Sequence, residues 1–257
     1  MRRHFLFIAF LVFWFSEASA QKDLRIFNHL SIGAEVSNMG IGIDASMPLT
    51  PFIDIQAGYT MFPGIKFNSS LGMNQTFGDI SKVPVKAKPL MKGGKALVNV
   101  MPVPMLTSFH VTAGIYFGSD NLMDIYNIEP MPEAIVDANR VVDEYNASHQ
   151  DYKMQNIGPA LGDYLLEPNE EGNIKTRLKV KPVKTYFGIG IGRGVPKGKV
   201  GFKMDLGCVL WGKPKVYCND IKVEDTNAGG DDAKLLKLIT KLKVYPVLSF
   251  RVCGKIF

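Results

Sequence analysis

Apolar and polar residues alternate strictly in several segments of the chain. Between Leu30 and Val36 the even positions are apolar, and the residues between them are Ser31, Gly33 and Glu35. A repeat of two residues is that of a β-strand with one apolar and one polar face. The alternation returns in segments 41–47, 53–60, 109–117, 186–191 and 200–210, with a weaker copy at 94–101 and a last one from Val247. The sequence therefore predicts eight strands and an all-β fold.

The composition of the polar face favours a closed barrel over a sandwich. In a soluble sandwich the polar face lies outside and accepts long side chains freely. Here that face consists mostly of glycine, serine and threonine, with single charges of both signs, as the narrow interior of a small barrel requires. We therefore expect an eight-stranded antiparallel up-and-down transmembrane β-barrel whose apolar face contacts lipid. A soluble secreted β-sandwich that acts as an adhesin stays open as an alternative.

The lengths of the connections agree with an up-and-down order. The connections after the second, fourth and sixth strands are short, near Pro48–Pro51, Pro102–Pro104 and Arg193–Gly198, and those after the third, fifth and seventh are long. This alternation puts all long loops on one side of the membrane, as in outer-membrane barrels. The first connection, at Asn38 and Met39, is short where the alternation predicts a long one.

Two of the long connections contain helical spacing. In segment 132–146 the apolar residues recur at steps of three and four, as they do in segment 231–242; the residues are Ile135, Ala138, Val142 and Tyr145 in the first, and Leu235, Leu238, Ile239 and Leu242 in the second. Such spacing is typical of short amphipathic helices. We expect these helices to pack locally on the barrel mouth, and binding of a partner is the alternative.

The first twenty residues have the features of a secretory signal peptide. Arg2 and Arg3 precede an apolar run from Phe5 to Phe15, and Ala18-Ser19-Ala20 fits a cleavage site. We expect residues 1–20 to be removed and residues 21–257 to form one outer-membrane β-barrel domain. The arginine pair leaves a twin-arginine export route open.

Charge and cysteine content narrow the possible partners. The net charge of +6 comes from lysines scattered along the chain, which argues against nucleic acid as a partner. Cys208, Cys218 and Cys253 lack the close paired spacings of zinc sites, and we expect no metal and no other cofactor. A disulfide between Cys208 and Cys218 remains open, although Cys208 is in phase with apolar residues of its strand.

Four segments resemble the small outer-membrane β-barrel proteins of Gram-negative bacteria, related to the OmpA-type transmembrane domain and to porin-family barrel domains. They are Lys184–Arg193, Gly201–Gly207, Trp211–Pro214 and Val244–Phe257. The resemblance implies a location in the cell outer membrane, contact with outer-membrane lipid, and recognition of the C-terminal strand by the barrel-assembly machinery. It leaves the long loops with an unknown extracellular ligand and implies no particular activity.

Aromatic residues near strand ends give two further expectations. Tyr59, Phe109, Phe117 and Trp211 could form the aromatic girdles of a membrane barrel. The terminal Phe257 lies on the opposite phase from the apolar residues of its strand, so we expect a bulge near 253–255.

One pair of residues suggests catalysis. Ser108 and His110 lie two apart on one strand, and some small barrels that deacylate lipid A use a serine and a histidine at this spacing. Here the order is reversed, the pair adjoins a short turn, and no carboxylate is placed by sequence to orient the histidine. The pattern favours a polar pair in the lumen, and a lipid-modifying hydrolase is the alternative function.

The inward phase also carries charges that could plug the lumen: Glu35, Asp44, Asp54, Lys184, Lys203, Asp205 and Arg251. An eight-stranded barrel has little free width, and buried charges need opposite partners. We therefore expect salt bridges that close the lumen. The glycines at 188, 190, 192 and 194 alternate too regularly for a phosphate loop. The predicted function is a structural or surface-binding barrel with no wide pore and no enzyme activity.

Overall fold

Eight strands close into a barrel in the order β1-β16-β13-β12-β7-β6-β3-β2 in the computed structural model, which describes residues 29–103, 108–149, 153–224, 238 and 240–256. Their bounds are β1 Ser31–Ser37, β2 Gly40–Thr50, β3 Ile53–Met61, β6 Lys92–Val100, β7 Phe109–Gly118, β12 Val183–Gly192, β13 Val200–Leu210 and β16 Val244–Lys255. Each strand pairs antiparallel with its neighbours, and β1 closes the barrel by pairing with β16. The eight predicted strands and the up-and-down order are confirmed, and the β-sandwich alternative is wrong.

The polar phase of each strand faces the lumen. In β1 the buried residues include Ser31 and Glu35, whereas Ile32 and Val36 are exposed on the outside. Small residues in this phase leave room for large side chains from across the lumen. A Cβ atom at Gly33 would lie 2.5 Å from Nε of Arg251. The predicted small lumen residues therefore have a packing role, because they accommodate the long inward side chains.

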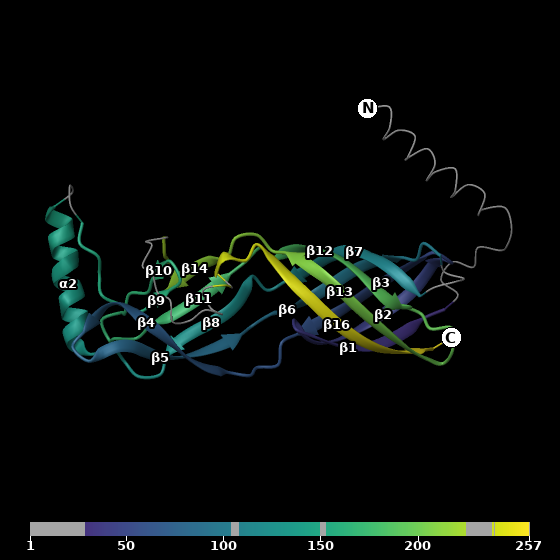
Figure 1. Cartoon of the computed structure of the whole chain (residues 1–257), viewed down its shortest axis with the longest axis horizontal. Helices are drawn as coiled ribbons and strands as arrows, with labels where there is room; N and C mark the ends of the chain where they lie inside the picture. The colour runs from purple at the N-terminus through teal and green to yellow at the C-terminus, as the bar shows by residue number, and fades with distance from the viewer. Residues whose placement is uncertain (1–28, 104–107, 150–152, 225–237, 239, 257) are drawn as a thin grey trace, which may run out of the picture.

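The short connections lie at one end of the barrel and the long ones at the other, as predicted (Figure 1). The first connection is the two-residue turn Asn38–Met39, which lies at the same end as the long connections. It is tied to the last strand, because the Asn38 side chain donates to the carbonyl of Pro246 and the Tyr245 hydroxyl donates to the carbonyl of Asn38. These contacts hold the first turn against the last strand.

The long connections form a second folded region, which we call the head. Among the described residues it contains a six-stranded sheet in the order β15-β14-β11-β8-β5-β4, a small two-stranded sheet and the helix α2. The elements are β4 Phe67–Phe77, β5 Ile80–Pro89, β8 Asn121–Asn127, α2 Glu133–Ser148, β9 Ala160–Leu161, β10 Tyr164–Leu165, β11 Lys175–Lys179, β14 Lys215–Cys218 and β15 Ile221–Lys222. This sheet was not predicted from the sequence, where these segments were expected only as long loops with helical spacing.

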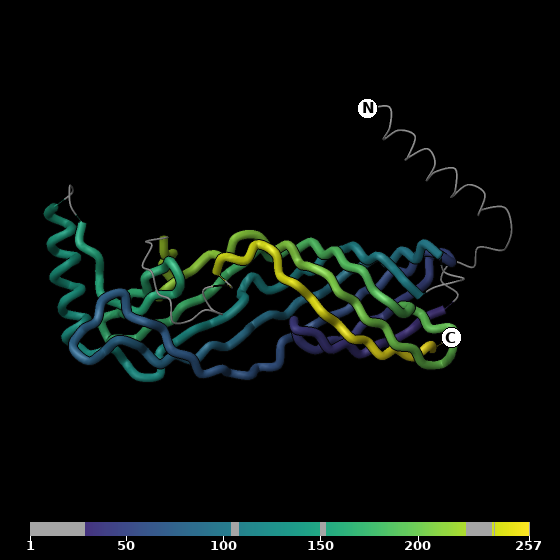
Figure 2. Tube along the Cα trace, viewed as in Figure 1, coloured from purple at the N-terminus to yellow at the C-terminus, as the bar shows by residue number. Residues whose placement is uncertain are grey.

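Half of the barrel wall continues into the head. Each of four adjacent barrel strands is joined to a head strand by a break of two to four residues. In chain order, β5 precedes β6, β8 follows β7, β11 precedes β12 and β14 follows β13. The four head strands keep the neighbour order of the barrel strands. The tube in Figure 2 shows these segments running from the barrel into the head, which makes the molecule long and narrow. The breaks contain residues such as Pro182 and Pro214, which interrupt pairing because proline has no backbone N–H.

The head has its own hydrophobic core. Buried apolar side chains of its sheet, including Val85, Ile125 and Leu178, pack with Ile135 of α2 and Leu161 of β9. The helix predicted at 132–146 is confirmed by α2. It does not lie on the barrel mouth as expected, but at the far end of the head (Figure 1), because the sheet occupies the space next to the barrel.

Some of the remaining predictions concern residues that the structure does not describe. The signal peptide, Phe257 and most of segment 231–242 lie outside them. The expected bulge near 253–255 is wrong, since β16 keeps a regular register with β1 through Lys255. Cys208 and Cys218 are both free, so the possible disulfide is not formed. Among the described residues, no helix has both the length and the apolar character needed to cross a membrane.

Candidate functional site

The outer face of the barrel is apolar and exposed on every strand. Its side chains include Ile32, Ile43, Tyr59, Val98, Val111, Ile189, Leu206 and Phe250, one from each of the eight strands. Phe202 is 74% exposed and Ile43 is 68% exposed, although both are large and apolar. Soluble monomers rarely expose a continuous apolar surface of more than a few hundred Å². A belt that encircles a closed barrel requires an apolar environment around it.

Aromatic side chains occur near both ends of this belt. Tyr59 and Phe117 are exposed near the head, both opposite Gly94 in the register, and Phe109 is exposed near the short turns. Trp211 does not join them, because it is 1% exposed, stacks on Tyr245 and donates its indole N–H to the carbonyl of Leu242 at 2.8 Å. The prediction of an aromatic girdle is therefore wrong for Trp211. Its partners Leu242 and Tyr245 belong to the segment that leads from the head into β16 and to β16 itself.

The lumen contains a buried ionic cluster around Asp44. Arg251 donates its Nε to Asp44 Oδ1 at 2.6 Å, and Lys95 forms ion pairs with both Glu35 and Asp44. Gln56 donates to the second oxygen of Asp44 at 2.9 Å. Arg251 and Lys95 are each 1% exposed. Charges this deeply buried are tolerated because each has an opposite charge and hydrogen bonds.

A second cluster forms around Asp205 and is linked to the first. Its carboxylate contacts Nε2 of His110 at 2.6 Å and Nζ of Lys203 at 3.0 Å. Lys203 also donates to the side-chain oxygens of Gln56 and Asn99, each at 3.0 Å. Because Gln56 contacts both Asp44 and Lys203, the two clusters are one network across the lumen.

The network is nearly balanced in charge. It joins the three carboxylates Glu35, Asp44 and Asp205 to the three cations Lys95, Lys203 and Arg251, with His110 beside them. The predicted salt-bridged plug is confirmed for five of the seven inward charges. Sequence analysis missed Lys95 because its strand looked weak, with apolar Leu97 on the same phase.

The other two predicted charges lie outside the network. Asp54 is near the short turns, where the backbone N–H groups of Gly194 and Val195 donate to its carboxylate. Lys184 is near the head and donates to the carbonyl of Ser119 at 3.1 Å. Both residues are on the inward phase. Asp54 is linked to the central network only indirectly, because the carbonyl of Gly194 accepts from Arg251 at 2.8 Å.

Apolar side chains close the lumen on the side of the head. They are Leu97, Tyr116, Tyr186, Val209 and Val247, all buried and continuous with the core of the head. The rings of Tyr116 and Tyr186 meet edge to face at 5.6 Å. Close packing of this kind fills the lumen next to the ionic network.

The possible catalytic pair is not assembled. Ser108 is exposed ahead of β7, whereas His110 is 1% exposed inside the lumen. Nδ1 of His110 faces the backbone carbonyls of Gly192 at 3.0 Å and Ser108 at 3.4 Å, and Nε2 faces Asp205. A carboxylate that the sequence did not place beside the histidine contacts it in the fold, since Asp205 comes from β13, far along the chain. The imidazole contacts the backbone of Ser108 and serves the ionic network.

Comparisons with known proteins give a distant likeness in fold. No protein family matches the sequence, and no curated protein matches it. The crystal structure of Acinetobacter baumannii CarO2 is 16% identical with a TM-score of 0.49, and the match covers 88% of this chain and 98% of that one. The crystal structure of Acinetobacter baumannii CarO is 15% identical with a TM-score of 0.46, covering 91% and 99%. Likeness at this level carries no conclusion about function, and the relation to OmpA-type domains stays a prediction.

Proposed function

We propose that the chain is a bacterial outer-membrane β-barrel protein with a closed lumen, which holds a folded head at the cell surface. The observation that carries this proposal is the exposed apolar belt on all eight strands around a polar, ion-paired interior. Only lipid covers such a belt without a partner protein on every side. A closed barrel also satisfies the backbone hydrogen bonds of its strands, as a membrane requires.

The connections at the two ends of the barrel support an orientation of the protein in the membrane. Short turns face the periplasm and long connections face the exterior in outer-membrane barrels. In this chain the long connections build the head, so the head belongs outside the cell. The role of the protein is structural or binding. Outer-membrane lipid surrounds the barrel, and an extracellular ligand binds the head. The barrel-assembly machinery recognises the C-terminal strand.

Membrane extraction and electrophoresis test this proposal. We expect the protein to stay in the outer-membrane fraction after a carbonate wash and to migrate faster in detergent electrophoresis when unheated than when boiled. Release by carbonate, or a mobility that heating does not change, would contradict it. In planar bilayers we expect no steps of porin size, and regular large steps would contradict the closed lumen.

The alternative of a lipid-modifying hydrolase has less support. It needs a serine hydroxyl within reach of an imidazole nitrogen, about 2.6–3.2 Å. The contacts of the His110 ring are instead with Asp205 and two backbone carbonyls. If replacing His110 with alanine changed the acylation of lipid A in the host, the hydrolase would become the better proposal.

A further inference from the structure

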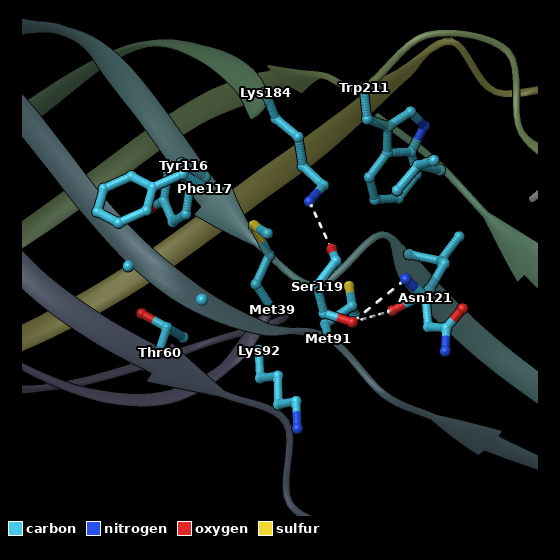
Figure 3. Close-up of a pocket in the computed structure, with 14 residues that line it drawn as sticks. Met39, Thr60, Met91, Lys92, Tyr116, Phe117, Ser119, Asn121, Lys184 and Trp211 are labelled. Carbon is cyan, nitrogen blue, oxygen red and sulfur yellow. Dashed lines mark hydrogen bonds between the residues drawn. The ribbon is translucent and has the colours of Figure 1, made fainter. Parts of the chain in front are cut away.

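A small cavity lies between the lumen and the head. Its walls come from the ends of barrel strands, with Thr60, Tyr116 and Lys184, and from the neighbouring chain, with Met39 and Trp211 (Figure 3). The cavity volume is about 30 Å³. One water molecule needs roughly 10–15 Å³ on this scale, so the space accommodates two waters or one small ion.

The charge of the cavity wall is one-sided. Two lysines, Lys92 and Lys184, line the cavity, and its described lining contains no Asp or Glu. The nearby Asp120 is held by Lys179 at 3.3 Å. Asp120 also attracts the ammonium group of Lys184, so this one carboxylate is shared between two lysines. The lining as a whole keeps an excess of positive charge, which attracts an anion.

Lys184 is the more constrained of the two lysines. Its side chain is buried, with 8% of the residue exposed, and its amine points toward the backbone carbonyl of Ser119 (Figure 3). A carbonyl oxygen takes one of the three ammonium donors and supplies no negative charge. Among the described residues Lys184 forms no close ion pair, in contrast to Lys95 and Lys203, which contact carboxylates. A buried cation without a contacting counter-charge is costly.

The rest of the wall favours a small monovalent ligand. Met39, Met91 and Trp211 are apolar and lower the local dielectric, which strengthens the attraction between an ammonium and an anion. Thr60 also lines the cavity, and its buried hydroxyl has no hydrogen-bond partner among the described residues.

We propose that this cavity is an anion site in which one chloride-sized or formate-sized anion contacts the ammonium group of Lys184. The anion supplies the contacting counter-charge that Lys184 lacks among the described residues. It also links the barrel to the head, because the walls of the cavity belong to both. The site goes beyond the proposed function and does not depend on a membrane location.

Bromide binding to the folded, full-length mature protein in a zwitterionic detergent tests the site. We expect saturable broadening of the bromide NMR signal, which chloride and formate reverse. Lys184→Met keeps the length of the side chain and removes its charge, and we expect affinity to fall by at least about tenfold, since truncating one partner of a buried charge pair has effects of this size. The matched control is Lys222→Met, which removes a charge from an exposed lysine of the head and should bind like the wild type.

The same broadening in Lys184→Met and the wild type would overturn the proposal. Should Lys184→Met fail to fold, crystals of the wild type grown in bromide decide the question. An anomalous peak beside Nζ of Lys184 supports the anion site. Water alone at this position, with no bromide peak, overturns it.

Discussion

At the scale of single residues, the lumen depends on long charged side chains placed opposite glycine. Arg251 passes beside Gly33 to reach Asp44, and His110 and Asp205 meet beside Gly190. A Cβ at Gly190 would lie 2.5 Å from Nε2 of His110. The charged and the small residues of the lumen were predictable, because both lie on the inward-facing phase of their strands. Which charged side chains pair was not predictable, since strand register and barrel closure decide which side chains meet.

Removing one member of the ionic network should destabilise the barrel strongly. We expect Arg251→Met to lower the free energy of unfolding by about 3–5 kcal/mol, because Asp44 loses a buried partner. Urea unfolding followed by the fluorescence of Trp211 measures the change. Arg177→Met is the control, since its ion pair with Asp220 is largely exposed and should contribute at most about 1 kcal/mol. Equal effects of the two changes would contradict the plug.

Filling a lumen glycine should also destabilise the barrel. Gly33→Ala places a methyl group against the guanidinium of Arg251, and we expect a loss of about 1–3 kcal/mol through overpacking. The temperature at which the fast-migrating folded form disappears in electrophoresis reports this loss. Gly198→Ala has nothing within 4 Å of its new Cβ and should leave that temperature unchanged or slightly higher. A neutral Gly33→Ala would show that Arg251 does not pass where the structure places it.

At the scale of elements, the barrel strands were predictable and the head was not. Most barrel strands are nine or more residues long, and apolar and polar residues alternate along them. Such a long alternation is typical of few other structures. In β5 the buried Val83, Val85 and Ala87 also alternate with exposed or half-buried residues, but Pro84 and Pro89 obscured the signal. The helix α2 was predictable from its spacing, whereas its place at the far end of the head depends on a sheet that the sequence had not indicated.

The outer face of β12 offers a test of lipid contact. Ile189→Lys puts a charge on the apolar belt, and we expect it to cost about 2–4 kcal/mol if the position is near the middle of a bilayer. Unfolding in lipid vesicles gives this free energy. Val141→Lys on α2 changes an equally exposed apolar residue of the head and should be tolerated. A harmless Ile189→Lys would argue that water, and not lipid, surrounds the barrel.

The core of the head gives a test of its independence from the barrel. Ile125→Ala removes a fully buried side chain from β8, and we expect a local loss of about 2–5 kcal/mol from the cavity that remains. Limited proteolysis should then cut the head while the barrel keeps its heat-dependent mobility. Ile221→Ala, at a residue 73% exposed, should leave the protease pattern unchanged. Loss of the folded barrel in Ile125→Ala would show that barrel and head unfold together.

At the scale of the whole molecule, three layers follow one another along the barrel axis. Polar groups and the ionic network fill the lumen toward the short turns, apolar rings close it toward the head, and the head continues half of the wall outward. The outer face is uniformly apolar over the barrel and mixed over the head. This division places the membrane around the barrel and leaves the head free for contact with a ligand outside the cell.

Cysteine labelling in intact cells tests the central claim most directly. The wild type should react weakly. Cys253 is buried, Cys208 lies on the lipid-facing phase of β13, and burial raises the pKa of the Cys218 thiol, which keeps that thiol protonated at neutral pH. We introduce one cysteine in the head by Val141→Cys and one in a short turn by Lys197→Cys, both at exposed positions. With a membrane-impermeant maleimide, we expect labelling of Val141→Cys in intact cells and of Lys197→Cys only after the outer membrane is permeabilised. Labelling in the reverse order, or of both variants in intact cells, would contradict an outer-membrane barrel with a surface head.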